Sequence, residues 1–166
     1  KYNMYDGPGV RSMAFFKGCP LRCKWCSNPE SQHRGFEIML KRDACVSCGA
    51  CAAACPVGVH RMVDGAHVVD RGASCIGCGA CLYGAVQVMG EDHSIDELVA
   101  FFDEDADFYR MSGGGITLSG GEALSQPQGA KSLLAASRER GYHTAVETCG
   151  YLPTETLLDI APYVDL

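Results

Sequence analysis

The segment VRSMAFFKGCPLRCKWC, residues 10–26, contains the two features that decide the fold. Its first seven residues form an apolar run fit for a buried strand, and a turn at residues 6–9 precedes it. Three cysteines follow the run in the spacing C-x3-C-x2-C. A ligand loop directly after a strand is typical of α/β proteins, whose functional loops lie at the carboxyl ends of parallel strands.

The second half of the chain has the same organisation of strands and motifs. From residue 94 onward we expect strands and helices to alternate, with strands at 115–119 and 143–147 and helices at 95–103, 127–140 and 153–161. Ser94 and Glu97 form a capping box at the start of the first helix, and Gly141 ends the second. This alternation predicts a parallel sheet with right-handed crossovers. Because residues 164–166 read as a strand just beginning, and because Lys1 is not a start methionine, we expect residues beyond both ends.

Cysteine is the unusual feature of the composition, with 11 in 166 residues. A disulfide scaffold is disfavoured because this count is odd, because no secretion signal is visible and because ten of the cysteines fall into three tight clusters. The formal net charge of −6 argues against a nucleic-acid-binding protein. No apolar run approaches the roughly 18 residues of a membrane helix. The composition predicts a cytoplasmic metalloprotein in a reducing compartment.

Residues 37–92 form a region of different composition that contains an internal repeat. The sequence CVSCGAC at 45–51 is echoed by CIGCGAC at 75–81. With Cys55-Pro56, the first copy has the C-x2-C-x2-C-x3-C-P spacing of bacterial ferredoxins, in which the fourth cysteine of each run serves the other cluster. We therefore expect an inserted ferredoxin-like α+β module that passes single electrons. A cluster that only holds a small fold together is the alternative.

The first cysteine loop has a different chemistry from that of the insert. Cys19, Cys23 and Cys26 can bind three irons of a [4Fe–4S] cluster and leave the fourth iron open to a substrate or cofactor. Zinc usually prefers C-x2-C pairs and a closed tetrahedral site, so zinc is the weaker interpretation. A closed cluster with a distant fourth cysteine is the other alternative.

Two further motifs follow expected strands. The segment GGGITLSGGE at 113–122 predicts a loop that exposes backbone amides and lets a ligand approach closely. A phosphate site is disfavoured because no Gly-Lys-Ser/Thr follows, and the carboxylate of Glu122 suits an ammonium group. In the segment ETCG at 147–150, Cys149 is interpreted as a small buried thiol. All five histidines lack paired metal spacing and are interpreted as ordinary surface or loop residues: His33, His60, His67, His93 and His143.

Taken in order, these motifs resemble the radical S-adenosylmethionine (SAM) activating enzymes of glycyl radical enzymes. The resemblance covers essentially the whole chain and rests on DGPGVR at 6–11, FKGCPLRC at 16–23, WCSNPE at 25–30, the insert, SGGE at 119–122 and ETCG at 147–150. The insert is most similar to those of the activating enzymes for choline trimethylamine-lyase and isethionate sulfite-lyase. The resemblance implies a partial radical SAM (β/α)6 barrel, truncated to about its first half at 1–36 and 93–166, with the ferredoxin-like module at 37–92.

The resemblance also implies which residues bind the cofactors. Cys19, Cys23 and Cys26 would hold the cluster whose open iron chelates the methionyl amine and carboxylate of SAM. Trp25 would border the adenine. One or two auxiliary iron–sulfur clusters would be held by the cysteines of the insert: Cys45, Cys48, Cys51, Cys55, Cys75, Cys78 and Cys81.

The two motifs of the second half would complete the SAM site. Gly120, Gly121 and Glu122 would lie along the methionyl amine. Glu147 and Thr148 match a stretch that contributes to the SAM site and to a monovalent-cation site, although Asp is common at the position of Glu147. The resemblance implies no catalytic residue beyond the cluster ligands.

The implied reaction begins with one electron from flavodoxin or ferredoxin. The reduced cluster cleaves the sulfonium C–S bond of SAM to methionine and a 5′-deoxyadenosyl radical, which takes hydrogen from a backbone glycine of a partner glycyl radical enzyme. The protein positions the cofactor and excludes oxygen, so we expect an anaerobic, cytoplasmic monomer with no nucleic-acid or membrane partner. Two alternatives stay open: a radical SAM enzyme that acts on its own small molecule or peptide, and a non-enzymatic ferredoxin-like electron carrier.

The second cysteine run departs from the ferredoxin pattern. It has Cys75, Cys78 and Cys81, but Ala85 stands where C-x3-C spacing would place a fourth cysteine. If four residues have been deleted, Cys81 is the fourth cysteine of the second run and completes the cluster of the first run. On the alternative alignment Cys81 is the third cysteine of the second run, and the cluster of the first run is the deficient one. Either way seven thiolates serve where eight are usual, so we expect one complete auxiliary cluster and one that is missing or [3Fe–4S]. A gap in the sequence itself is the other explanation.

Overall fold

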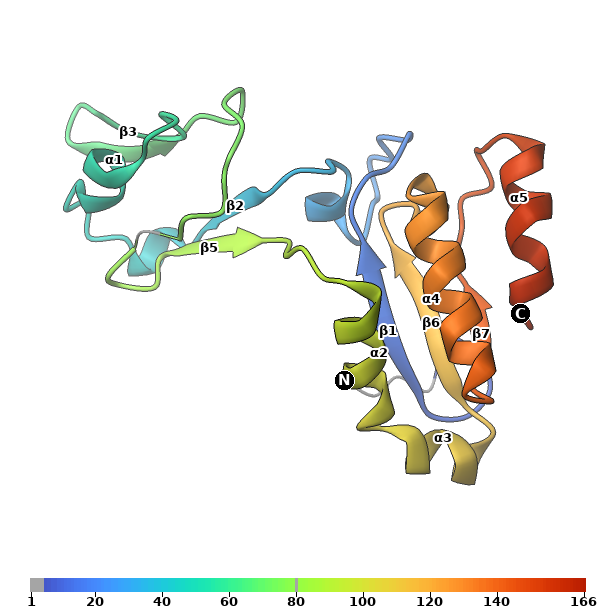
Figure 1. The fold of residues 1–166 in the computed structure, drawn as a ribbon. Coiled ribbons are helices and arrows are strands. Elements are labelled where there is room, and N and C mark those ends of the chain that lie inside the picture. The colour runs from blue at the N-terminus through green and yellow to red at the C-terminus, as the bar shows by residue number, and fades with distance from the viewer. Residues whose placement is uncertain (1–4, 80) are drawn as a thin grey trace. The chain divides into compact units, whose positions relative to one another are not determined.

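The computed structural model describes residues 5–79 and 81–166, which form two compact units (Figure 1). One unit combines the N-terminal segment up to Arg34 with Asp92–Leu166. The other is the intervening segment Gly35–Glu91, which contains the seven cysteines of the insert. Each unit has its own sheets.

The larger unit is built on a parallel sheet in the order β1-β6-β7, as the alternation of strands and helices predicted. The strands are β1 (Arg11–Phe16), β6 (Gly115–Gly120) and β7 (His143–Val146). In register, Arg11 lies opposite Gly115, which lies opposite His143. The carboxyl ends of all three strands therefore lie at one edge of the sheet, and each of the three motifs follows one of these ends.

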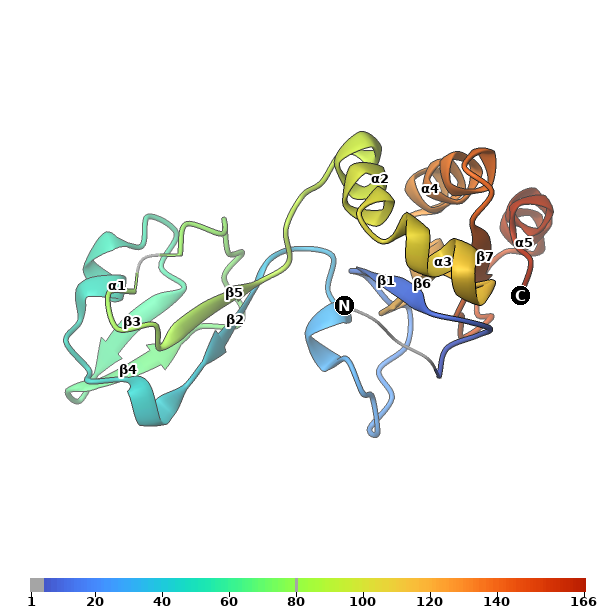
Figure 2. The same ribbon diagram turned by 90° about the horizontal axis from the view of Figure 1, so that it is seen from below.

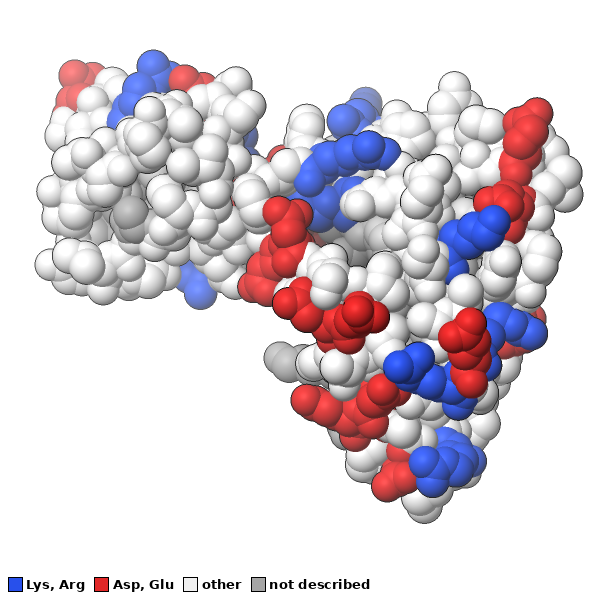
Figure 3. Space-filling view, in the orientation of Figure 1, with Lys and Arg blue, Asp and Glu red and all other residues white. Residues whose placement is uncertain are grey.

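The described part of this unit, from residue 5 onward, contains four α-helices: α2 (Ile95–Asp103), α3 (Ala106–Ser112), α4 (Pro127–Glu139) and α5 (Thr154–Ile160). Figure 2 shows α2, α4 and α5 along one face of the sheet. Apolar side chains of the four helices, of β6 and of residues 123–124 form one core: Val99, Phe102, Tyr109, Ile116, Leu118, Ala123, Leu124, Ala130, Leu133, Leu134 and Ile160. Short 3-10 helices lie at Pro29–Ser31, Ala123–Ser125 and Ala161–Tyr163. Figure 3 shows both acidic and basic side chains on the surface of this unit. Lys131 and Asp159 form one exposed ion pair.

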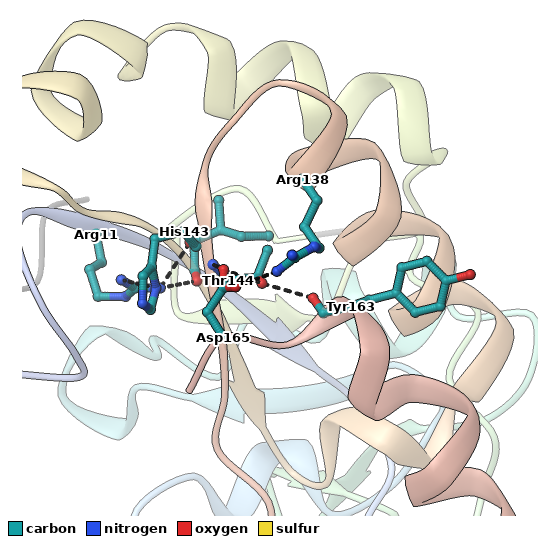
Figure 4. Close-up of polar contacts among 7 residues, drawn as sticks. Arg11, Arg138, His143, Thr144, Tyr163 and Asp165 are labelled. Carbon is teal, nitrogen blue, oxygen red and sulfur yellow. Dashed lines mark hydrogen bonds and ion pairs between the residues drawn. The ribbon is translucent and has the colours of Figure 1, made fainter.

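A buried arginine connects the amino ends of the strands. Arg11 is fully buried, and its Nε donates to Thr117 Oγ1 at 2.7 Å. Its other nitrogens donate to the carbonyl oxygens of Pro8 (3.0 Å), His143 (3.1 Å) and Ile116. Figure 4 shows the guanidinium beside His143. Since a buried guanidinium is costly unless its N–H groups are bonded, these contacts fix the edge of the sheet opposite the motifs.

The segment 164–166, expected to start a strand, lies against β7 but is not itself a strand in the described residues. The N–H groups of Asp165 and Leu166 both donate to Thr144 O, and Val146 N donates to Leu166 O. The carboxylate of Asp165 accepts from Thr144 N at 2.9 Å and pairs with Arg138 (Figure 4). These hydrogen bonds lower the pKa of Asp165 to about 2.

Apart from residue 80, the smaller unit contains two antiparallel strand pairs and one short α-helix. Strand β2 (Glu37–Leu40) pairs antiparallel with β5 (Val86–Met89), and β3 (His60–Val63) pairs antiparallel with β4 (Ala66–Val69). A 3-10 turn at Arg42–Ala44 and helix α1 (Ala50–Ala54) contain or adjoin the first cysteine run. Asp64 and Gly65 both have positive φ angles (49° and 75°), as the tight turn between β3 and β4 requires.

Across residues 5–79 and 81–166, the structure contains no helix that is both long enough and apolar enough to span a membrane.

The predicted capping box at the start of α2 is confirmed, and it yields a stability prediction. Glu97 N donates to Ser94 Oγ at 3.2 Å, and Ser94 N donates to Glu97 Oε2 at 2.8 Å. Ser94→Ala should lower the free energy of unfolding by about 1 kcal/mol, because an N–H group at the helix start loses its partner. Anaerobic urea titration followed by circular dichroism measures this change. Ser132→Ala, the same substitution at an exposed position inside α4, should be neutral or slightly stabilising; equal losses at both positions would contradict the capping argument.

Candidate functional site

The first cysteine loop begins directly after β1 and is fixed by its own backbone. Gly18 N donates to Ser31 O at 2.7 Å, and Cys19 N donates to Gln32 O at 3.0 Å. Cys23 is exposed, while Cys19 and Cys26 are half-buried, and all three are free thiols. Trp25, expected to border an adenine, is 84% exposed. The loop thus presents three thiols and an aromatic ring to incoming groups, a donor set that fits a three-thiolate iron–sulfur cluster.

The Ser-Gly-Gly-Glu turn after β6 packs against this loop. Gly121 N donates to Phe16 O at 2.9 Å, and Glu122 N donates to Gly18 O at 2.8 Å. A Cβ atom on Gly121 would lie 2.4 Å from Ser31 O, so a side chain here would separate the turn from the cysteine loop. The expectation that this turn exposes its amides to a ligand is therefore wrong for these two residues. Their N–H groups hold the chain's own backbone, which sequence patterns did not reveal.

Glu122 connects the turn after β6 to the segment after β7. Its side chain is fully buried, and both carboxylate oxygens accept from Thr148 Oγ1 at 2.9 Å. The carboxylate also accepts from Cys149 N at 2.8 Å and from Leu124 N at 3.0 Å. Glu122 thus fixes the position of Thr148, another predicted site residue. The contact of Glu122 with a methionyl amine stays a prediction.

Glu147 and Cys149 lie in the irregular segment after β7. Glu147 is exposed and accepts a hydrogen bond from Ser119 Oγ at the end of β6. Cys149 is also exposed, so its interpretation as a buried thiol is wrong, because the chain leaves the strand at Val146. Partial burial raises the pKa of the Cys149 thiol, and the nearby Glu122 and Cys19 raise it further. A raised pKa disfavours the thiolate that a metal requires, and this argues against Cys149 as the distant fourth ligand of a closed cluster.

A cavity of about 470 Å³ borders the cysteine loop. Its wall includes Cys19 and Arg22 from the loop, Arg34, and Tyr151 and Pro153 from the segment after β7. This volume is in the range of small-molecule sites. Among the residues of the larger unit that the sequence predicted to bind a cluster or SAM, Cys19 lies on the wall of this cavity.

In the smaller unit, one cavity collects four cysteines from both repeats. Cys45, Cys48 and Cys51 of the first run line it together with Cys81 of the second. This is the set expected if Cys81 is the fourth cysteine of its run. The donor set of four thiols fits one complete [4Fe–4S] cluster. The three other cysteines of the insert, Cys55, Cys75 and Cys78, lie outside this wall.

The local structure of Cys81 matches that of Cys55, the fourth cysteine of the first run. In both cases the backbone N–H groups that follow the cysteine bond its sulfur and lower the pKa of the thiol. Gly58 and Gly84, each three residues after its cysteine, have φ angles of 71° and 65°. This correspondence supports the alignment in which the second run has lost its third cysteine.

Two of the five histidines are not surface residues. His60 and His67 are buried, with 5% and 3% of their surface exposed, and their interpretation as surface or loop residues is wrong. The ring atoms His60 Nδ1 and His67 Nε2 lie 3.0 Å apart. The sequence alone did not reveal this pair, because seven residues separate the two histidines. The β3–β4 hairpin places both on one face of the strand pair, and the turn signal at Asp64-Gly65 could have revealed that hairpin.

The other histidines differ in environment. His143 is half-buried beside Arg11, with 3.2 Å between His143 Nδ1 and Arg11 Nη1. His33 and His93 are exposed, as expected.

Comparison with known proteins identifies the type of domain and the relatives. Residues 37–84 match the family model of a 4Fe-4S dicluster domain, and residues 5–56 match that of a 4Fe-4S single cluster domain. The chain is 53% identical to the choline trimethylamine-lyase activating enzyme of Oleidesulfovibrio alaskensis, over 100% of this chain and 56% of the relative. It is 48% identical to the (2S)-3-sulfopropanediol sulfolyase activating enzyme of Bilophila wadsworthia, over 95% and 54%. The chain belongs to the family of glycyl-radical-enzyme activating enzymes.

Other members of this activating-enzyme family match along the same length. An isethionate sulfite-lyase activating enzyme of Oleidesulfovibrio alaskensis is 43% identical over 99% of this chain and 56% of the relative. The chain therefore spans about half the length of the curated relatives it matches. The match to the choline trimethylamine-lyase activating enzyme extends over 172 residues, whereas this chain has 166.

The cysteine arrangement of this family member predicts an unequal pair of auxiliary clusters. In a Cys19/Cys23/Cys26 triple-alanine variant, iron and sulfide analysis with Mössbauer spectroscopy should detect one [4Fe–4S] cluster, with the other absent or [3Fe–4S]. About four or about seven irons per chain should therefore be found. Two full [4Fe–4S] clusters would contradict the deficiency.

Two matched variants test which cysteine is missing. Inserting Cys-Ala-Ala-Ala before Cys81 copies residues 51–54 and restores the C-x2-C-x2-C-x3-C spacing, so it should raise the iron content to about eight. Ala85→Cys should leave it unchanged, because Ala85 is a buried residue of the exit turn. Restoration by Ala85→Cys would favour the opposite alignment.

Proposed function

We propose that this chain is the SAM-cluster half of a glycyl-radical-enzyme activating enzyme. The observation that carries the proposal is an accessible three-cysteine loop at the carboxyl end of β1, hydrogen-bonded to the turn that contains buried Glu122. The parallel order β1-β6-β7, with helices between the strands, supports the first half of a (β/α)6 radical SAM barrel. The family relationship supports the same fold and activity.

The residues of the larger unit have separate parts in this proposal. Cys19, Cys23 and Cys26 bind a [4Fe–4S] cluster and leave one iron to the amine and carboxylate of SAM. When bound and reduced by one electron, the cluster and SAM supply methionine and a 5′-deoxyadenosyl radical. Trp25 borders the adenine, and Glu122 orients the segment that begins with Glu147.

Segment 147–149 completes the site. Thr148 lies at the carboxyl edge of the sheet through its bond to Glu122, and Glu147 stands beside Ser119 at the end of β6. Their oxygens suit a monovalent cation next to the SAM carboxylate. Gly120 and Gly121 allow the turn to approach the cysteine loop closely enough for both to touch one small ligand.

The partners follow from the same chemistry. The radical takes a hydrogen atom from a backbone glycine, giving 5′-deoxyadenosine and a glycyl radical on the partner enzyme. The names of the relatives, which activate lyases of choline, sulfopropanediol and isethionate, support a lyase as that partner. Electrons reach the site from flavodoxin or ferredoxin, with the auxiliary clusters as relays. The protein acts in the cytoplasm, under anaerobic conditions and as a monomer.

Isotope transfer tests this function. The reduced full-length protein, incubated anaerobically with SAM and a partner enzyme deuterated at glycine, should transfer deuterium to 5′-deoxyadenosine and generate a glycyl radical. Mass spectrometry measures the label, and electron paramagnetic resonance (EPR) measures the radical. Label from a small molecule instead would favour a radical SAM enzyme with its own substrate. Absence of SAM cleavage in fully loaded protein would favour an electron carrier.

A further inference from the structure

The buried histidine pair of the smaller unit lies beside the four-cysteine cavity. His67 lines that cavity together with Cys45 and Cys51. His67 Nδ1 is 3.7 Å from Cys45 Sγ, and its Nε2 is 3.0 Å from His60 Nδ1. One ring nitrogen from each histidine and Cys51 Sγ lie within 4.8 Å of one another. One proposed cluster ligand, Cys45, is thus in contact with His67, and a second, Cys51, lies near both rings.

The chemistry of these atoms fixes the direction of the hydrogen bonds. A neutral imidazole has one N–H donor and one acceptor nitrogen, and the 3.0 Å contact between the two rings requires one of the two nitrogens to accept. A cluster-bound thiolate can only accept. His67 Nδ1 therefore donates to Cys45 Sγ, its Nε2 accepts, and His60 Nδ1 donates to that nitrogen. The result is a chain of two hydrogen bonds that ends on sulfur.

We propose that His67 is a positioning residue that donates a hydrogen bond to the Cys45 thiolate of the complete auxiliary cluster and thereby raises its reduction potential, and that His60 orients His67. Hydrogen bonds to cluster sulfurs withdraw electron density and favour the reduced state. The proposal rests on cluster binding by Cys45, Cys48, Cys51 and Cys81, and it gives the insert a cluster that accepts electrons readily.

A separate metal site of Cys51, His60 and His67 is the competing interpretation. Cys51 belongs to the C-x2-C-x2-C run and lines the same cavity as the other three cysteines. A zinc ion on Cys51 would therefore remove one ligand from the four-thiol set. The ferredoxin spacing of that run favours the cluster.

An EPR-monitored redox titration tests the proposal in the full chain, with the cysteines at 19, 23 and 26 replaced by alanine so that the signal comes from the insert. His67→Leu should make the reduced-to-oxidised ratio about tenfold lower at the parent midpoint, a shift of about 59 mV to more negative potential for a one-electron couple. His67→Asn, which keeps an N–H donor, should retain most of the parent reduction potential. Val68→Ala, at the neighbouring exposed position of β4, should cause no shift in the reduction potential.

The outcomes separate this proposal from its rivals. An unchanged potential in loaded His67→Leu, or a shift of equal size in Val68→Ala, would overturn it. If His67→Leu fails to assemble its cluster, the potential is measured in His67→Asn and His60→Phe instead. His60→Phe should shift the potential in the same direction as His67→Leu, but by a smaller amount. Loss of one equivalent of zinc from both histidine variants would establish the separate metal site. Because the titration needs no SAM, failure of the activating function would not alter its result.

Discussion

The buried carboxylate of Glu122 is the interaction on which the larger site depends. It accepts from Thr148 Oγ1 and from the N–H groups of Cys149 and Leu124, so it joins the ends of β6 and β7. A buried carboxylate is costly unless donors satisfy it, and therefore these segments keep one arrangement. The close backbone approach at Gly121 extends that arrangement to the cysteine loop after β1.

The smaller unit brings four cysteines together although its second run has three cysteines in place of four. Cys55 and Cys81 keep the same amide environment and the same left-handed glycine three residues on, although the runs before them differ in length. Cross-pairing between the repeats lets Cys81 join the first run in one cavity. The other set therefore has only Cys55, Cys75 and Cys78, and His67 lies beside the set of four.

Local signals predicted much of the fold. The strand periods, the capping box at Ser94 and the end of α4 at Gly141 all follow from short-range chemistry, and the parallel sheet follows from their alternation. Helix α3 was missed because neither a side-chain cap nor a proline marks its start at Asp105, whereas Pro153 marks the start of the equally short α5. The burial of His60 and His67 and the internal use of the Gly121 amide depend on pairing between distant segments, which one sequence does not reveal.

The proposed function requires Cys19, Cys23 and Cys26 to hold a cluster with an open iron. The EPR spectrum of the reduced full-length protein, recorded before and after adding SAM, tests this requirement. The spectrum should change, because the open iron gains two ligands, and Cys23→Ala should abolish the change while leaving the signals of the insert. The change should persist in Cys149→Ser, since Cys149 is not a ligand on this account. A spectrum unaltered by SAM in fully loaded protein would contradict the open-iron assignment.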